Sequence, residues 1–366
     1  MHSTRMKTFP HLFLLMTVLL LSLFFTVYSD SISEYAANTL FLCAVSVIPS
    51  LFPFMVLSSI ASKAAAVLTK GTSSSASTLI PIFLGALCGF PVGASTVASM
   101  YLNGALTKKK AEYLCALCNN TGPAYLISVV GTVFWKNSSI GILFYVCQII
   151  SAFAVFIFCR IFHKIKKSSD PYNSGISVSD NKPLSDKKIS PKSLCHTFCS
   201  SVTDSALSVI KICGYIVFFK VMCDSLILLL PNTILSRYIH AVVSCILEFT
   251  SGARAAANIG GVVGIALCGF SIGFSGLSVM AQSTGILSAA GLSSFPLLKL
   301  KFFSGLLSAI LSATAYKYIN ITEPVFMYHP SVRLCFSSMI TVILLFLFLV
   351  SAVFCAVSQR KFLPKS

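Results

Sequence analysis

The chain has 366 residues, of which 56% are hydrophobic and only 10% are charged, with a formal net charge of +17. A soluble domain of this size carries far more charge, so the composition excludes an ordinary soluble protein. Many apolar runs approach or exceed the roughly 20 residues that span a bilayer, and no β-barrel-like alternation is visible. The sequence therefore predicts an all-α polytopic membrane protein with about 8 spanning helices.

The N-terminal membrane half covers residues 1–160 and holds several apolar runs. Pro49 and Pro53 lie inside the second run, and proline frees helix carbonyls that must find partners. We therefore expect the stretch IPSLFPF, at 48–54, to be kinked or broken. The first run is expected to be an uncleaved spanning helix rather than a signal peptide. The runs of this half lie at 9–28, 35–61, 78–103, 111–134 and 140–159.

The run at 78–103 contains ALCGFPVGAS, in which two glycines and a proline interrupt the apolar sequence. Three lysines follow at 108–110, and lysine and arginine are retained on the cytoplasmic side of a membrane. Only a segment that enters and returns keeps these lysines on the same side as Arg5 and the basic linker. We expect a Gate-like re-entrant helical hairpin turning at 88–93, and cytoplasmic N- and C-termini.

Residues 161–193 are rich in Lys, Ser, Asp, Asn and Pro, and are expected to form a basic cytoplasmic linker. The C-terminal membrane half then covers residues 194–366. Because the basic residues fall between apolar runs, we expect a lipid bilayer as the partner and no nucleic acid. The runs of this half lie at 205–230, 234–257, 260–290, 295–318 and 334–357.

The two halves share a sequence repeat. ALCGF at 86–90 returns at 266–270, and Gly93, Ser95 and Met100 align with Gly273, Ser275 and Met280. A broken segment precedes each copy, and a small polar interruption follows each. Chance similarity is the simpler alternative, but the shared order of features favours duplication. Paired interruptions in two halves mark the binding sites of transporters, so a second hairpin is expected at about 260–290.

Several motifs resemble those of the YlbJ-like family of sporulation integral membrane proteins of endospore-forming bacteria. They are GFPVGA at 89–94, CNNTGPAY at 118–125, LEFTSGAR at 247–254 and GFSGLSVMAQ at 273–282. The resemblance covers nearly the whole chain and implies a Gate, or nucleoside-recognition, domain. It also implies a transporter-like architecture at the cell membrane and a role in spore formation, without naming a substrate.

Polar residues at the interruptions are the candidate ligand contacts. Glu248 lies in an apolar run; it either binds a cation, a proton or a substrate, or pairs with Arg254. The other polar candidates either contact a ligand, or cap broken helix ends or serve as small residues in helix–helix packing. These candidates are Asn119, Asn120, Thr121, Thr250, Ser275 and Gln282.

Glycines and prolines at the same interruptions are expected to shape hairpin tips and helix breaks. They are Gly89, Pro91, Gly93, Gly122, Pro123, Gly252, Gly269 and Gly273. No catalytic motif is present, and the CxxC of Cys115 and Cys118 lacks further ligands, so we expect no enzyme, cofactor or metal site.

The leading hypothesis is a transporter or channel for a small polar solute or ion, such as a nucleoside, an acid or a metal. The alternative is a non-transporting membrane scaffold for spore envelope assembly, with the linker as its partner-binding segment. An intramembrane enzyme ranks last because no reactive pair supports it. A homo-oligomer or a spore-envelope protein is a further possible partner.

Overall fold

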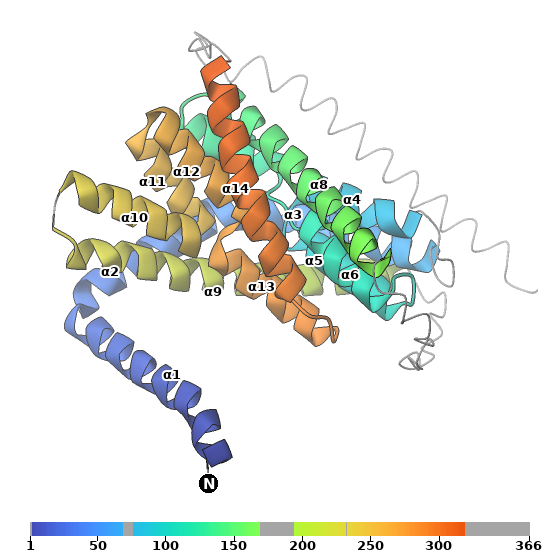
Figure 1. Ribbon diagram of the computed structural model, residues 1–366, viewed down its shortest axis with the longest axis horizontal. Coiled ribbons are helices and arrows are strands. Elements are labelled where there is room, and N and C mark those ends of the chain that lie inside the picture. The colour runs from blue at the N-terminus through green and yellow to red at the C-terminus, as the bar shows by residue number, and fades with distance from the viewer. Residues whose placement is uncertain (1, 69–75, 169–193, 232, 319–366) are drawn as a thin grey trace, which may run out of the picture.

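A computed structural model describes residues 2–68, 76–168, 194–231 and 233–318. These residues are helical, with no strand among them. Figure 1 shows the helices packed into one body from which α1 projects. The helices, with two π-helical stretches labelled η, are α1 (His2–Val27), α2 (Ser29–Leu42), η1 (Cys43–Val47), α3 (Ile48–Leu68), α4 (Ala76–Cys88), α5 (Val92–Leu102), α6 (Lys108–Cys118), α7 (Pro123–Tyr125), η2 (Leu126–Phe134), α8 (Ser138–Ser168), α9 (Leu194–Leu229), α10 (Ile234–Leu247), α11 (Phe249–Ile259), α12 (Gly261–Phe274), α13 (Gly276–Ala289) and α14 (Phe295–Tyr318).

Fewer helices than expected are long enough to cross a membrane. The described residues contain four such helices, or five if α1 and α2, which are bent by 93°, form one span. The expected spans at 111–134 and 234–257 are each split by a polar break into shorter pieces, so the count of eight is not confirmed. The expected helix at 334–357 and most of the linker lie outside the described residues. The candidate spans are Ser138–Ile161, Thr197–Leu229, Gly261–Ala289 and Phe295–Tyr318.

The segment around Pro49 stays helical instead of breaking. The π-helical stretch η1 ends two residues before Pro49, and Pro53 lies inside α3. A proline removes one backbone donor, and a π-turn shifts the hydrogen-bond register so that the chain continues as a helix. The predicted kink or break at 48–54 is therefore not seen as an interruption, and the helix is instead distorted just before it, at Cys43–Val47.

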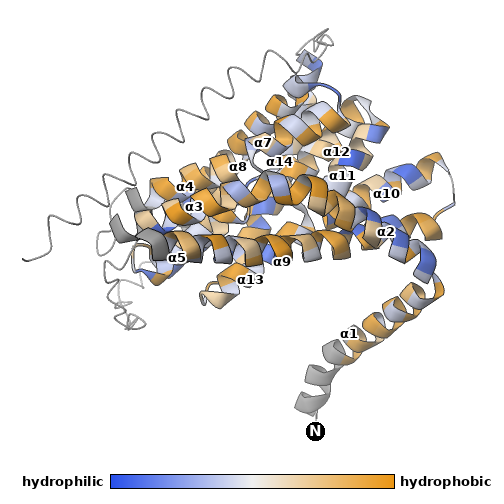
Figure 2. Ribbon diagram, turned by 180° about the vertical axis from the view of Figure 1, so that it is seen from behind, coloured by the Kyte–Doolittle hydropathy of each residue, from blue (hydrophilic) through white to orange (hydrophobic). Residues whose placement is uncertain are grey.

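The outer faces of the long helices are apolar. Ile150 of α8, Leu207 and Ile210 of α9, and Ile310 of α14 are each more than half exposed. Figure 2 shows hydrophobic colouring along the outward surfaces of α3, α4 and α9. Soluble monomers rarely expose such contiguous apolar surface, so these faces are suited to contact with lipid.

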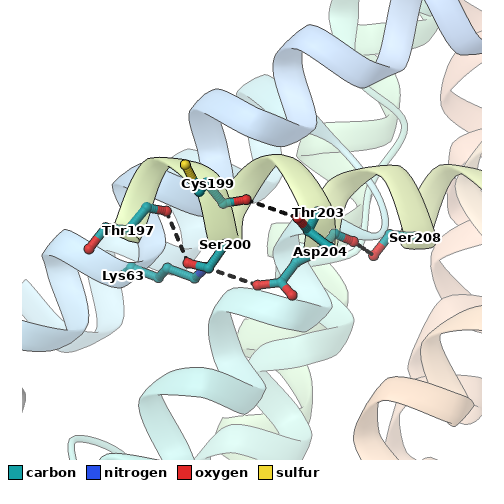
Figure 3. A network of polar contacts seen from close by, with 7 residues as sticks. All are labelled: Lys63, Thr197, Cys199, Ser200, Thr203, Asp204 and Ser208. Atoms are coloured by element: carbon teal, nitrogen blue, oxygen red, sulfur yellow. Dashed lines mark hydrogen bonds and ion pairs between the residues drawn. The ribbon is translucent and has the colours of Figure 1, made fainter. Parts of the chain in front are cut away.

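Helices α3 and α9 are joined by a polar contact near one end of the body. The Lys63 ammonium of α3 lies 2.9 Å from both the Asp204 carboxylate and the Ser200 hydroxyl of α9 (Figure 3). The Asp204 side chain is 61% exposed, so this ion pair contributes at most about 1 kcal/mol to stability. It serves to position α3 rather than to form a buried site.

The two halves share one core. Helix α8 of the first half packs against α14 of the second, where the Ser151 and Ser304 hydroxyls lie 3.1 Å apart. Helices α12 and α14 also pack closely because small residues face each other. A Cβ at Gly269 would lie 2.8 Å from the Ser312 hydroxyl, and one at Gly273 would lie 2.7 Å from the Ser308 Cβ.

The aligned repeats have different local structures. In the first copy the chain breaks at Gly89 to Pro91, whereas the aligned residues of the second copy continue through α12 as far as Phe274. Together α12 and α13 count as one 29-residue candidate span, so the re-entrant hairpin expected at 260–290 is not confirmed. Gly269 and Gly273 lie inside α12, where they allow close packing against α14 rather than a turn.

Candidate functional site

A break in the apolar body lies at 118–122, from the last residue of α6 to the residue before α7, and four of its five residues are buried. Gly85 of α4 and Gly93 of α5 face the Cys118 carbonyl so closely that a Cβ at either would overlap its oxygen. Gly89 lies between α4 and α5 with a φ of +75°. A Cβ added at Gly89 would lie 2.6 Å from the backbone nitrogen of Gly122. The predicted turn at 88–93 is thus a helix break. Its glycines, which lack a Cβ, allow the backbone of the 118–122 break to pack directly against it.

Asn120 links these two breaks. Its side-chain Nδ2 donates to the Leu117 carbonyl at 2.6 Å and so caps the end of α6. Its backbone carbonyl accepts the Phe90 N–H at 2.7 Å. The expected capping role is therefore present, and the backbone of the same residue joins the 118–122 break to the 89–91 break.

Gln148 of α8 completes the 118–122 break and was not among the sequence candidates. The Thr121 N–H donates to its Oε1, and its Nε2 donates to the Thr121 carbonyl, both at 3.0 Å. Gln148 is fully buried. No local sequence pattern reveals the partner of a single carboxamide in an apolar helix. The available signal is that a polar side chain in a membrane helix usually bonds to another part of the protein.

We expect Gln148→Met to destabilise the protein by about 2–4 kcal/mol, because it leaves a buried backbone donor and acceptor unpaired. Unfolding in mixed micelles measures this loss. Asn103→Ala is the control, since its amide also bonds a backbone carbonyl, at 2.9 Å, but at an exposed site. Equal losses in the two variants would contradict the assignment.

Lys301 of α14 is fully buried and was also missed by the sequence analysis. Its Nζ lies 3.3 Å from the Asn120 Oδ1. Within the described residues no carboxylate lies within ion-pair distance of it. A charged group inside a membrane helix is costly and usually functional, so the KLK sequence at 299–301, within the apolar run at 295–318, is a signal that could have identified it.

Glu248 forms the break between α10 and α11 and is fully buried. Its Oε1 accepts the Thr250 N–H at 2.9 Å and its Oε2 accepts the Ser251 N–H at 2.6 Å. The carboxylate therefore caps α11 and lies at the positive end of that helix. Neither ion pair found among the described residues joins it to Arg254, and its role as a ligand contact stays a prediction.

Ser275 forms a further break, between α12 and α13, with a φ of +73°. The next residue, Gly276, packs against the Glu248 break: its Cβ would lie 2.9 Å from the Phe249 nitrogen. The Ser271 hydroxyl of α12 donates to the Phe249 carbonyl at 3.2 Å. The two breaks of the second half are therefore in direct contact.

Aromatic side chains join the breaks of the first half to those of the second. The Phe249 ring lies 5.1 Å from the Phe90 ring and 5.4 Å from the Tyr125 ring, centroid to centroid. The Tyr125 hydroxyl donates to the Thr250 Oγ1 at 3.1 Å. The breaks at 89–91, 118–122, Glu248 and Ser275, which are distant in sequence, thus meet; we call this region the central site.

Buried polar atoms without a hydrogen-bond partner surround the central site. The Asn119 Oδ1 accepts the Ser283 hydroxyl at 3.2 Å, but the Asn119 Nδ2 has no partner. Each unpaired buried group costs about 1–3 kcal/mol, so these atoms are free to bond water or a polar ligand. Among the described residues, further unpaired atoms at these breaks and on α13 are Thr121 Oγ1, Ser251 Oγ, Ser278 Oγ and Gln282 Oε1; others lie elsewhere in the helices.

The remaining predicted residues lie at or near these breaks. Gly122 precedes α7 and Pro123 is its first residue, where proline is favoured. Pro91 is the residue before α5. Gly252 lies in α11, where a Cβ would be 2.5 Å from the Cys245 Cα of α10. Most of the predicted residues lie at or beside these breaks, whereas Gln282 is buried within α13 and Gly269 and Gly273 pack α12 against α14; their role as ligand contacts stays a prediction.

A cleft of about 930 Å³ lies beside the Glu248 break. Residues of α2, α9, α10 and α11 line it, and Ser251 brings it to the first turn of α11. In the part of the chain that the structure describes, no three His, Cys, Asp or Glu side chains are placed to hold a metal ion.

Comparison with known proteins supports the resemblance seen in the motifs. The chain is 24% identical to the sporulation integral membrane protein YlbJ of Bacillus subtilis (strain 168), over 64% of this chain. The match covers 62% of the length of that relative. The chain is therefore similar in sequence to YlbJ, as its motifs predict. No family model matches the chain. No solved structure matches it either.

Proposed function

We propose that this chain is a multi-pass cell-membrane protein that moves a small polar solute or ion through the central site. The observation that carries the proposal is the meeting of helix breaks around buried polar atoms without partners. Broken helices leave backbone groups unpaired, and in lipid such groups are tolerated only against protein or a water-filled cavity. Transporters use paired breaks of this kind to hold their cargo.

The relative's name supports a biological setting for this activity. The YlbJ relative is a sporulation integral membrane protein, and we propose that this chain also acts in spore formation. A Gate-type arrangement, with the 89–91 break as a re-entrant turn, fits the lysines at 108–110. On the same argument both termini are cytoplasmic.

Lys301→Met tests the transport proposal. Among the described residues, the buried ammonium has the Asn120 side chain as its hydrogen-bond partner and no carboxylate beside it, so its removal should cost little stability. We expect the variant to fold normally and to lose at least about 90% of solute flux, because cargo at the 118–122 break loses the buried positive charge beside Asn120. Flux of nucleosides, aromatic dicarboxylates and divalent metal ions into liposomes containing the purified protein is the measurement.

Lys299→Met is the matched control, since Lys299 lies on the same helix but is exposed. It should keep full flux and full thermal stability. If the unaltered protein moves none of these solutes, or if Lys301→Met and Lys299→Met move them equally, the central site is not the transport site.

A further inference from the structure

We propose that the cleft between α9, α10 and α11 binds the anionic group, a phosphate or a carboxylate, of a small molecule. This inference rests on the proposed function only in that the bound molecule is also the cargo. The volume of about 930 Å³ lies within the usual range for small-molecule sites. The charged and polar groups of its lining define which molecule it accepts.

The cleft has an excess of positive charge. The Lys220 ammonium lies 2.8 Å from the Asp224 carboxylate, and this largely buried pair neutralises itself. Arg237 of α10 and Arg254 of α11 also line the cleft. Among the described residues neither arginine has a carboxylate within ion-pair distance. Two guanidinium groups thus line a cleft whose carboxylate, Asp224, is already paired with Lys220.

The other titratable groups of the lining do not cancel this charge. They are Tyr35, from α2, and Tyr238 and His240, from α10, and none of them is a carboxylate. A cation would meet two unpaired arginines and a neutralised carboxylate. An anion instead gains the planar, multi-donor guanidinium groups that suit phosphate and carboxylate oxygens.

Ser251 is an independent observation that points to a ligand. Its side chain lines the cleft, is only 7% exposed, and its hydroxyl has no hydrogen-bond partner. Its backbone N–H is already bound by Glu248, which leaves the hydroxyl as the free donor. A buried hydroxyl without a partner is costly, and an anion oxygen held by the arginines would satisfy it.

The inference can be tested by anion binding to the purified full-length protein in micelles free of anionic lipid. Inorganic phosphate and succinate are the probes, and calorimetry measures their affinity. We expect Arg237→Gln and Arg254→Gln each to weaken binding by about tenfold, the loss of one charge-assisted contact. Arg160→Gln is the control: it removes the same charge from an exposed arginine that stacks on Phe156, far along α8.

A second arm distinguishes a soluble anion from a lipid headgroup. Mass spectrometry measures the phosphatidylglycerol that remains bound when the protein is purified from vesicles of phosphatidylglycerol and phosphatidylcholine. Retention by the unaltered protein and by Arg160→Gln, with loss in the cleft variants, supports the same anion site with a lipid as its ligand. If the unaltered protein binds no anion in either arm, or if the cleft variants bind as the control does, the inference is overturned.

The two proposals fail separately. Lys301→Met alters the central site and leaves the cleft intact, so it should bind phosphate like the unaltered protein while losing flux. If anion binding is absent but flux of a neutral nucleoside or a metal ion remains, the anion inference fails and the transport proposal stands. If binding follows the arginines but no solute is moved, the anion site stands and transport fails.

Discussion

Replacing Glu248 with alanine is expected to destabilise the folded protein by about 3–5 kcal/mol. The carboxylate is fully buried and binds two backbone N–H groups, those of Thr250 and Ser251. Alanine leaves both donors without a partner at the start of α11, and it also removes the negative charge from the positive helix end. Unfolding in mixed micelles measures the change in free energy.

Two further variants separate capping from general disruption at this position. Glu248→Gln keeps an oxygen acceptor, so it should lose about half as much stability as Glu248→Ala. Glu112→Ala removes a carboxylate that accepts one backbone N–H, from Ser293 at 2.8 Å, at a partly exposed site. That control should cost less than about 1 kcal/mol. A stable Glu248→Ala variant would show that the carboxylate does not hold α11.

Gly93→Ala is expected to cost about 3 kcal/mol or more, because the added methyl group would overlap the Cys118 carbonyl oxygen. Either α5 or the 118–122 break must move. The fraction of protein that remains monodisperse after heating in detergent reports the loss. Gly214→Ala is the control: nothing lies within 4 Å of its Cβ position in α9, so helix propensity should make it neutral or slightly stabilising.

A double variant sharpens this prediction. Adding Cys118→Ala to Gly93→Ala should not restore stability, because the obstructing atom belongs to the backbone and not to the Cys118 side chain. In the pair Gly273→Ala and Ser308→Gly, recovery should be partial, since the nearest atom, the Ser308 Cβ at 2.7 Å, is removed but backbone atoms of Ser304 and Gly305 remain at 2.9 Å. Rescue of Gly93→Ala by Cys118→Ala would mean that the contact is made by side chains.

The positions of the helix breaks could be predicted from the sequence because each carries residues that oppose a helix in an apolar run. Gly89 and Pro91, the CNNTGP stretch and Glu248 fall at observed breaks. The sequence could not separate a glycine that turns the chain from one that packs a helix, since both roles require the absence of a Cβ. Gly269 and Gly273 were therefore predicted to form a turn, whereas in the structure they lie within α12 and pack against α14.

The partners of the breaks were beyond prediction because they come from distant helices. Asn120 receives Lys301 from 181 residues away, and Thr121 receives Gln148 from 27 residues away. No periodicity or motif specifies such pairs; they arise from how α8 and α14 pack. Lys301, like Glu248, is a charged residue inside an apolar run, so the rule that such residues are functional or paired applies to both.

The contact between Gln148 and Thr121 shows how one side chain can satisfy backbone groups that lie outside a helix. A carboxamide has the same donor and acceptor as a peptide group, so Gln148 imitates one rung of a β-ladder with Thr121. A single side chain thus replaces the neighbouring strand that extended backbone would otherwise need in lipid. Because both bonds come from one side chain, Gln148 fixes the position of α8 against the 118–122 break.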